Sequence, residues 1–163
     1  MICGSLRRKK ETIKDIDIVL ECDSHEILAI QTLAQNLGTI VQSGSQSVRF
    51  LRNNISIDLR LTPLQYFGSM VNYYTGSAEF NIKLRADAKR RGWLINERGV
   101  FLAGSTIRIT RLNGVLTYLD GDKFSYDNTM WYPIVNENFV DGRDEKDLFD
   151  ILEITWVEPE NRV

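Results

Sequence analysis

The chain has 163 residues, of which 43% are hydrophobic and 10% aromatic, a composition typical of an ordinary globular protein. Disordered, collagen-like and membrane-spanning classes are excluded, since no apolar run approaches the roughly 18 residues of a membrane helix. The net charge of −2 hides an asymmetry: residues 1–111 carry a balance of +6 and residues 112–163 a balance of −8. The first part is therefore the one suited to a polyanionic partner.

Strands are predicted where apolar and polar residues alternate, over 1–5, 16–21, 39–43, 47–51 and 55–61. A helix is predicted over 27–37, where Asp23 or Ser24 can cap the start and Gly38 the end. A short aromatic helix follows over 63–74.

The remaining predicted elements are, in order, a helix over 78–91, hairpins over 92–128 and an acidic helix over 145–154. Ser77 can cap the first of these helices. The fold class is therefore α+β, with a mixed or antiparallel sheet. We expect two lobes, an α/β lobe over 1–72 and a smaller α+β lobe over 73–163, with a hinge near 73–77.

A few residues bear on the cellular compartment and on the kind of metal site that the chain could hold. The N-terminus has no apolar signal-peptide core, so we expect a protein of the cytoplasm or nucleus that is not secreted. Cys3 and Cys22 stand in apolar segments without metal-like spacing, which favours two buried free thiols. The lone His25 falls on a predicted helix, and no zinc site is predicted.

Three aspartates interrupt apolar strands. Asp15 and Asp17 project from one face of their strand because side chains alternate, and Asp58 shares a face with Arg60. An isolated Asp-x-Asp is more typical of a solvated strand face. If the two strands are neighbours, however, three carboxylates converge and need cations to stay ionised. Carboxylate oxygens then predict two Mg²⁺ ions, with Mn²⁺ as a substitute, in a two-metal phosphoryl transfer site.

Gly4-Ser5 directly follows the first predicted strand, and Arg7 and Arg8 come just beyond it. A glycine lets backbone amides approach a phosphate, whose oxygens a Ser hydroxyl and an Arg fork can bind. A bare Gly-Ser carries no signal. Ten residues ahead of an intrastrand Asp-x-Asp, it predicts the triphosphate-binding half of a nucleotidyltransferase site.

Four segments in this order, "GSLRRKKETIKDIDIVL", "IDLRLTP", "YYTGSAEFNIKLRADAKRRGWLINERGVF" and "EKDLFDILEITWVEPENR", resemble the family X DNA polymerases, the DNA polymerase beta type. The resemblance covers the palm and thumb regions. It implies a DNA-directed DNA polymerase that adds dNTPs to a primer 3′-hydroxyl by two-metal phosphoryl transfer, in gap filling or DNA repair. The implied partners are dNTP and primer–template or gapped DNA, with no membrane. Longer relatives have an N-terminal lyase-type region, which we expect a partner chain or a further domain to replace.

The resemblance also implies roles for single residues. Asp15 and Asp17 would hold both metal ions, and Asp58 would hold the catalytic one and activate the primer hydroxyl. The nucleotide-binding set is Gly4, Ser5, Arg8, Lys14, Tyr73, Tyr74, Gly76 and Asn81. The DNA-binding set is Arg60, Lys83, Arg85 and Lys89. Within these sets Ser5 and Arg8 would bind the outgoing pyrophosphate, the tyrosines the sugar, Asn81 the incoming base and Arg85 the template.

The chain departs from the family pattern at several places. Lys14 stands where a small residue is usual, Ser56 where an Arg is often found, and Arg98 where an aromatic residue is common. Residues 103–140 are longer and more acidic than the family's hairpin. Two alternatives stay open: a nucleotidyltransferase that is template-independent or has another substrate, and an inert DNA-binding subunit.

Overall fold

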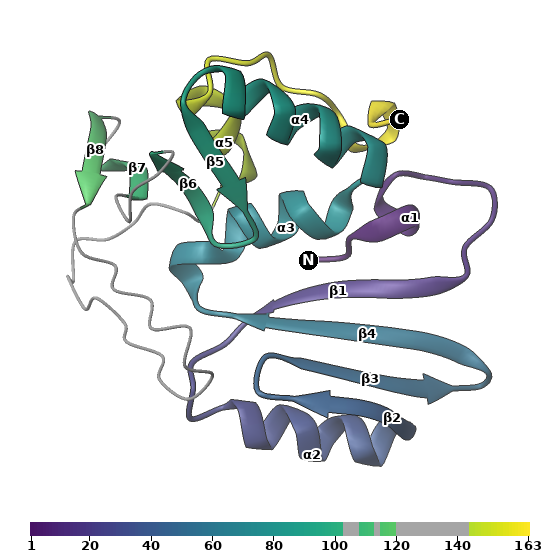
Figure 1. Ribbon diagram of the computed structural model, residues 1–163. Helices are drawn as coiled ribbons and strands as arrows, with labels where there is room; N and C mark the ends of the chain where they lie inside the picture. The colour runs from purple at the N-terminus through teal and green to yellow at the C-terminus, as the bar shows by residue number, and fades with distance from the viewer. Residues whose placement is uncertain (103–107, 113–114, 120–143) are drawn as a thin grey trace.

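The computed structural model describes residues 1–102, 108–112, 115–119 and 144–163. Two four-stranded sheets and the helices around them build this part of the chain (Figure 1), and the predicted α+β class is confirmed. None of the described helices is long and apolar enough to cross a membrane. The acidic insertion predicted over 103–140 lies mostly outside the described residues.

The first sheet has the strand order β1-β4-β3-β2. Its strands are β1 (Asp15–Glu21), β2 (Thr39–Gly44), β3 (Ser47–Arg52) and β4 (Ile55–Thr62). Strands β1 and β4 are parallel, whereas β3 is antiparallel to both β4 and β2, as the predicted mixed sheet requires. Asn53 and Asn54 have φ angles of 52° and 65°, and their turn pairs Arg52 with Ile55.

Helix α2 (Ile27–Leu37) covers one face of this sheet, at β2 and β3. The core between them is formed by Cys22, Ala34, Val48, Phe50, Leu59 and Leu61. Ile57 and Leu59 both pack toward this core. Because side chains alternate along a strand, Asp58 projects from the opposite face.

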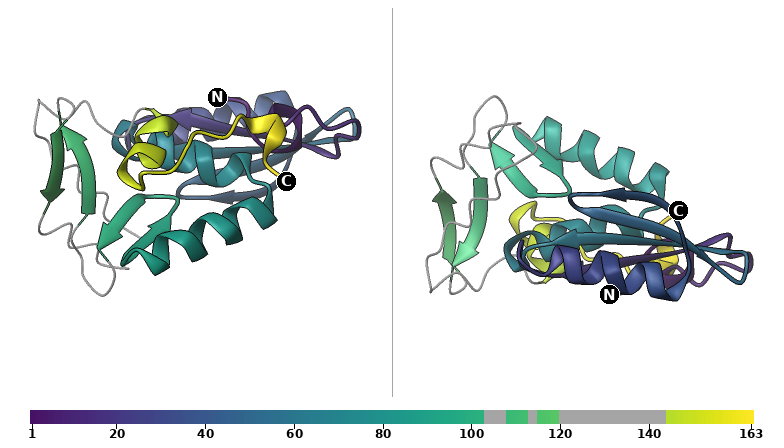
Figure 2. Two further views of the ribbon diagram at one scale, coloured as in Figure 1. Left: turned by 90° about the horizontal axis from the view of Figure 1, so that it is seen from above. Right: turned by 90° about the horizontal axis from the view of Figure 1, so that it is seen from below.

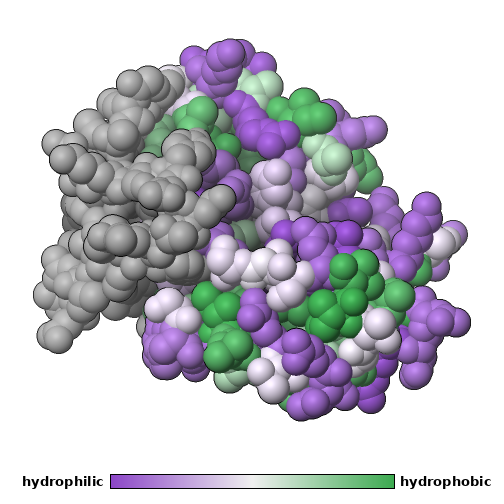
Figure 3. Space-filling view, turned by 60° about the horizontal axis from the view of Figure 1, so that its bottom comes forward, coloured by the Kyte–Doolittle hydropathy of each residue, from purple (hydrophilic) through white to green (hydrophobic). Residues whose placement is uncertain are grey.

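Helix α2 also exposes part of its apolar surface. Leu28 and Leu33 are exposed by 73% and 57%, while Ala34 is exposed by only 1%. The space-filling view in Figure 3 shows apolar patches among polar side chains on the face that it draws. The helix is therefore anchored to the sheet through the stripe that contains Ala34.

The opposite face of the first sheet carries α1 (Gly4–Arg7) and α3 (Phe67–Thr75), and η1 (Leu64–Tyr66) leads from β4 into α3. A small core of Cys3, Val19, Met70 and Val71 joins α3 to β1. In Figure 1 helix α3 lies between the two sheets, and it contacts both β1 and α5. It therefore connects the two halves of the molecule.

The second half contains α4 (Ala78–Arg90), β5 (Trp93–Asn96), β6 (Gly99–Leu102), β7 (Arg108–Leu112), β8 (Val115–Leu119), α5 (Glu145–Ile151) and η2 (Pro159–Asn161). The strands form an antiparallel sheet in the order β5-β6-β7-β8 (Figure 2). As predicted, Ser77 caps α4, since its Oγ accepts a hydrogen bond from the Phe80 N–H at 3.2 Å. Leu84, Ile95 and Phe149 belong to the core that α4, α5 and β5 share.

Three predicted elements differ from the structure. In place of a strand over 1–5 there is one bridge, from Ile2 to Ile18, because Gly4 has a φ of 60° and begins a helical turn. His25 lies in the turn before α2, and the N-cap of this helix is Glu26 rather than the predicted Asp23 or Ser24. Helix α5 ends at Ile151, and the φ of 52° at Glu153 prevents its continuation.

Candidate active site

A pocket of about 400 Å³ lies between the α1 turn, the start of β1 and helix α4. Its lining residues are Gly4, Ser5, Arg8, Asp15, Asp17, Tyr73, Tyr74, Gly76, Ala78, Asn81, Ile82 and Arg85. All of these except Ala78 and Ile82 belong to the residues that the sequence predicts for the site. The predicted residues Lys14, Asp58, Arg60, Lys83 and Lys89 are not part of this lining.

The predicted aspartates stand on neighbouring strands. In the parallel pairing of β1 with β4, Asp17 is directly opposite Asp58, and Asp15 is opposite Ser56. Asp15 is exposed, Asp17 is half-buried and Asp58 is buried. The adjacency on which the predicted convergence depends is therefore present, while the metal-binding role of the three residues stays a prediction.

Asp17 occupies an environment that disfavours its charge. Burial raises the pKa of Asp17, and the charges of Asp15 and Asp58 raise it further, against smaller opposing effects of Arg60 and Arg49. A bound cation would offset this repulsion. Because the donors are carboxylate oxygens without nitrogen or sulfur, the site fits Mg²⁺ or Mn²⁺.

The Asp58 carboxylate is held by two arginines. Its Oδ2 accepts hydrogen bonds from Arg49 Nη2 at 2.6 Å, Arg49 Nε at 3.2 Å and Arg60 Nη2 at 3.0 Å. Sequence reasoning missed Arg49, which pairs with Asp58 across β3 and β4. The two-residue turn at Asn53-Asn54 fixes this register and could have predicted the contact.

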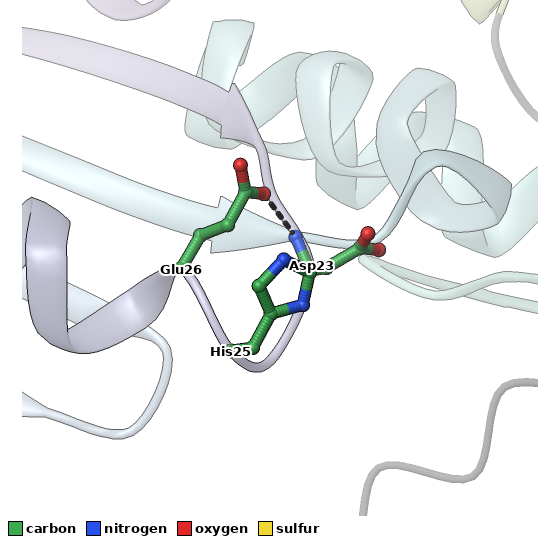
Figure 4. Close-up of side chains that lie close together, drawn as sticks. All are labelled: Asp23, His25 and Glu26. Atoms are coloured by element: carbon green, nitrogen blue, oxygen red, sulfur yellow. Dashed lines mark hydrogen bonds between the residues drawn. The ribbon is translucent and has the colours of Figure 1, made fainter.

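Another group of metal-ligand side chains lies outside the pocket, in the turn after β1. Donor atoms of Asp23, His25 and Glu26 lie within 4.8 Å of one another (Figure 4). All three residues are exposed, and Glu26 Oε2 accepts a hydrogen bond from the Asp23 backbone N–H at 2.8 Å. Among the described residues, Asp15, Asp17 and Asp58 form no group this close, so bound ions would have to draw them together.

Gly4 is required where the α1 turn meets β1. Its φ is 60°, and a Cβ at this position would lie 2.0 Å from Asp17 Oδ2. The backbone conformation disfavours any larger residue, and a Cβ here would also force the Asp17 carboxylate to move. Gly4 brings the α1 turn directly onto the Asp17 carboxylate.

We expect Gly4→Ala to destabilise the protein more than Gly92→Ala does. Gly92 also has a positive φ, 82°, but a Cβ there would meet nothing within 4 Å. Both changes cause backbone strain, and the overlap with Asp17 adds about 1–3 kcal/mol at Gly4 only. Urea unfolding of the two variants measures the difference. Equal losses would show that the contact with Asp17 relaxes freely.

Arg8 lines the pocket and is held by the end of α3. Its Nη1 donates to the Thr75 carbonyl oxygen, and its Nε is buried without a hydrogen-bond partner in the structure. A buried donor without a partner is costly unless a ligand or water binds it.

The other wall of the pocket is formed by the end of α3 and by α4. Tyr73 and Tyr74 are in edge-to-face contact, with ring centroids 5.2 Å apart, and the Arg60 guanidinium lies 4.8 Å from the centre of the Tyr74 ring. Asn81 Nδ2 donates to the Tyr73 carbonyl oxygen at 2.7 Å. Arg85 follows one turn later on the same helix and is exposed.

Four other predicted residues lie away from the pocket lining. Lys14 precedes β1 and is exposed, and Lys83 and Lys89 are exposed on α4. The Arg60 guanidinium forms an ion pair with Asp58 and lies over the Tyr74 ring. Nucleotide binding by Lys14 and DNA binding by Arg60 and the two α4 lysines stay predictions.

Known proteins resemble this chain in sequence and in structure. The family described as DNA polymerase beta thumb matches residues 70–163. The DNA polymerase/3'-5' exonuclease PolX of Bacillus subtilis is 37% identical over 101 residues, 60% of this chain and 18% of that protein. DNA polymerase lambda of Rattus norvegicus is 25% identical over 181 residues, 98% of this chain and 28% of that protein.

Two solved structures of Leishmania infantum polymerase beta share the fold. A ternary P/T complex matches with a TM-score of 0.67 and 23% identity, over 100% of this chain and 66% of that one. A ternary gap complex has the same TM-score and identity, over 99% of this chain and 61% of that one. Of the two relatives compared by sequence, PolX and DNA polymerase lambda, the chain spans less than a third of the length of each.

Proposed function

Because the DNA polymerase beta thumb family matches more than half of the chain, the chain belongs to the family X DNA polymerases, and we propose that it is a template-directed DNA polymerase. It would extend a primer 3′-hydroxyl with dNTPs, in gap filling or repair. Residues 1–72 would form the palm and residues 73–163 the thumb. The observation that supports this proposal is the pocket, where the α1 turn, the Asp15–Asp17 pair and the Asn81–Arg85 face of α4 meet.

The α1 turn would bind the triphosphate. Gly4 leaves space for a close approach, the Ser5 hydroxyl can donate to a phosphate oxygen, and Arg8 has an unsatisfied Nε. Charge-assisted hydrogen bonds from Arg8 would orient the β- and γ-phosphates as a leaving group. Arg8 is therefore expected to contribute to nucleotide affinity.

Asp15, Asp17 and Asp58 would hold two Mg²⁺ ions. When bound, such ions neutralise charge on the attacking and leaving oxygens. The primer O3′ would attack the α-phosphorus in line, while the bond to the bridging oxygen breaks and pyrophosphate leaves. Asp58 Oδ1 has no described hydrogen-bond donor, unlike Oδ2, so it is the oxygen that would accept the hydroxyl proton.

Template and sugar selection would take place on the opposite wall. The Tyr73–Tyr74 pair would pack against the sugar, and Asn81 and Arg85 would face the base pair that forms. The exposed Lys83 and Lys89 would add sequence-independent contacts to DNA phosphates. DNA affinity should consequently fall steeply as the salt concentration rises.

We expect the purified chain to extend a 5′-labelled primer with the dNTP that matches the template base. Primed, gapped and single-stranded DNA are compared on one gel in Mg²⁺, in Mn²⁺ and in EDTA. Template-directed addition that EDTA removes supports the proposal. Addition irrespective of the template base would favour a template-independent nucleotidyltransferase. DNA binding without nucleotide incorporation in either Mg²⁺ or Mn²⁺ would favour an inert DNA-binding subunit. The predicted location in the cytoplasm or nucleus and the predicted partner chain stay predictions.

A further inference from the structure

A buried carboxylate joins the two ends of the chain. Glu145, the first residue of α5, accepts a hydrogen bond from Arg7 Nη2 on Oε2 at 2.7 Å. Its Oε1 accepts one from Arg162 Nη1 at 2.5 Å. The side chains of Glu145 and Arg162 are exposed by 5% and 0%, and that of Arg7 by 19%. We call these three residues the ion triad.

Stability alone is a poor explanation for the ion triad. Removing three charged groups from water is so unfavourable that well-packed apolar side chains often do as well or better in such a place. Arg162 Nη2 is even left buried without a partner in the structure. What the triad supplies, in contrast to an apolar cluster, is a fixed geometry between the elements that it joins.

One end of the triad lies in the α1 turn, beside the pocket lining, of which Arg7 itself is not a part. Arg7 belongs to α1 and lies between Ser5 and Arg8 in sequence, the two residues that line the pocket. Its Nη1 also donates to Thr75 Oγ1 at 2.6 Å, at the end of α3. The position of the α1 turn is therefore tied to Glu145.

The other end reaches the base-facing side. The Arg162 guanidinium lies 5.2 Å from the centre of the Phe80 ring and 4.8 Å from that of Trp156. Phe80 is on α4, directly before Asn81, and it stacks on Phe149 of α5. A shift of Arg162 would therefore displace Phe80 and with it helix α4, which carries Asn81 and Arg85.

We infer that Glu145 is a positioning residue that couples the two walls of the pocket. The inference rests on the proposed function. Phosphates bound by the α1 turn would fix Arg7, and Glu145 and Arg162 would carry this constraint to α4, which faces the base pair. Nucleotide binding and base selection would then depend on a carboxylate that touches neither substrate.

A second ion pair provides a matched control. Lys9, just after α1, pairs with Glu160 of η2 at 3.0 Å, and both are exposed, by 73% and 39%. It joins nearly the same two segments as the ion triad. It is solvated and contacts none of the rings that pack on Arg162, so its loss should leave the coupling intact.

The test compares Glu145→Gln with Glu160→Gln in single-turnover insertion at increasing dNTP concentrations. For Glu145→Gln we expect the apparent dNTP Kd to rise about tenfold and the ratio of correct to incorrect insertion to fall. Affinity for primed DNA, measured by fluorescence anisotropy, should be unchanged in both variants. A folded Glu145→Gln protein that behaves like Glu160→Gln would overturn the inference.

Two additions keep the result decisive. If Glu145→Gln does not fold, Arg7→Lys replaces it in the test. This variant keeps the positive charge and the buried Glu145–Arg162 pair, but it loses the guanidinium that binds both Glu145 and Thr75. The same loss of nucleotide affinity is expected. Hydrogen exchange with dATP and Mg²⁺ needs no polymerisation: residues 78–90 should gain protection in the unmodified protein and not in the variant. If the unmodified chain extends no primer, the proposed function fails, and equal protection of the two proteins would overturn the coupling separately.

Discussion

Replacing Asp58 with asparagine is expected to reduce primer extension at least about 10³-fold. The change removes the charge of the carboxylate that would receive the primer hydroxyl proton, while it preserves the shape of the side chain. It also leaves Arg49 and Arg60 with a neutral partner, and the protein should lose about 1–3 kcal/mol of stability. The rate of primer extension and urea unfolding, measured on the same preparation, separate the two effects.

Asp87→Asn is the matched control. Asp87 of α4 also pairs with two arginines, Arg90 at 2.7 Å and Arg91 at 3.4 Å, but on the surface away from the pocket. Its loss should leave extension unchanged and reduce stability only slightly. Extension by a folded Asp58→Asn protein within tenfold of the unmodified rate would contradict the assignment of Asp58.

Local sequence patterns predicted most of the first sheet. The alternation around Asp15, Asp17 and Asp58 fixed which face each side chain takes, because a strand has only two faces. It also misled at Gly4, where an alternating stretch looked extended although the glycine turns the chain. This turn brings Gly4 close to Asp17 of β1, and no pattern around Gly4 contains that contact.

Contacts between distant segments account for what sequence reasoning missed. Arg49 could have been found from the hairpin register, since nine residues separate it from Asp58. Glu145 could not, because 138 residues separate it from Arg7 and no periodicity relates the two. In the sequence Glu145 and Arg162 look like ordinary surface charges, whereas the fold buries both of them.

Asp17→Asn is expected to abolish extension and yet to raise the Tm of the metal-free protein at neutral pH by a few degrees. The pKa of Asp17 is raised by burial and by the neighbouring carboxylates, so the folded state disfavours its ionised form. A neutral amide of the same shape removes that penalty. Loss of activity together with a gain in stability is typical of a residue retained for function.

The sign of the pH dependence follows from the direction of this shift. An acid with a folded-state pKa above its value in the unfolded chain stabilises the fold while it is protonated. This contribution is lost as the pH rises from about the ordinary value of 3.8 through the raised pKa. The stability advantage of Asp17→Asn should therefore grow across this window and then stay constant.

Magnesium should reverse the order of stability. A cation bound between the carboxylates would favour the ionised form, so Mg²⁺ should raise the Tm of the unmodified protein and have little effect on Asp17→Asn. Asp23→Asn, in the exposed turn with His25 and Glu26, tests the other acidic group. If Asp23→Asn removed the Mg²⁺ response and Asp17→Asn kept it, the ion would bind in that turn. The negative charge of Asp17 would then be offset by the nearby Arg60 and Arg49, which lower its pKa.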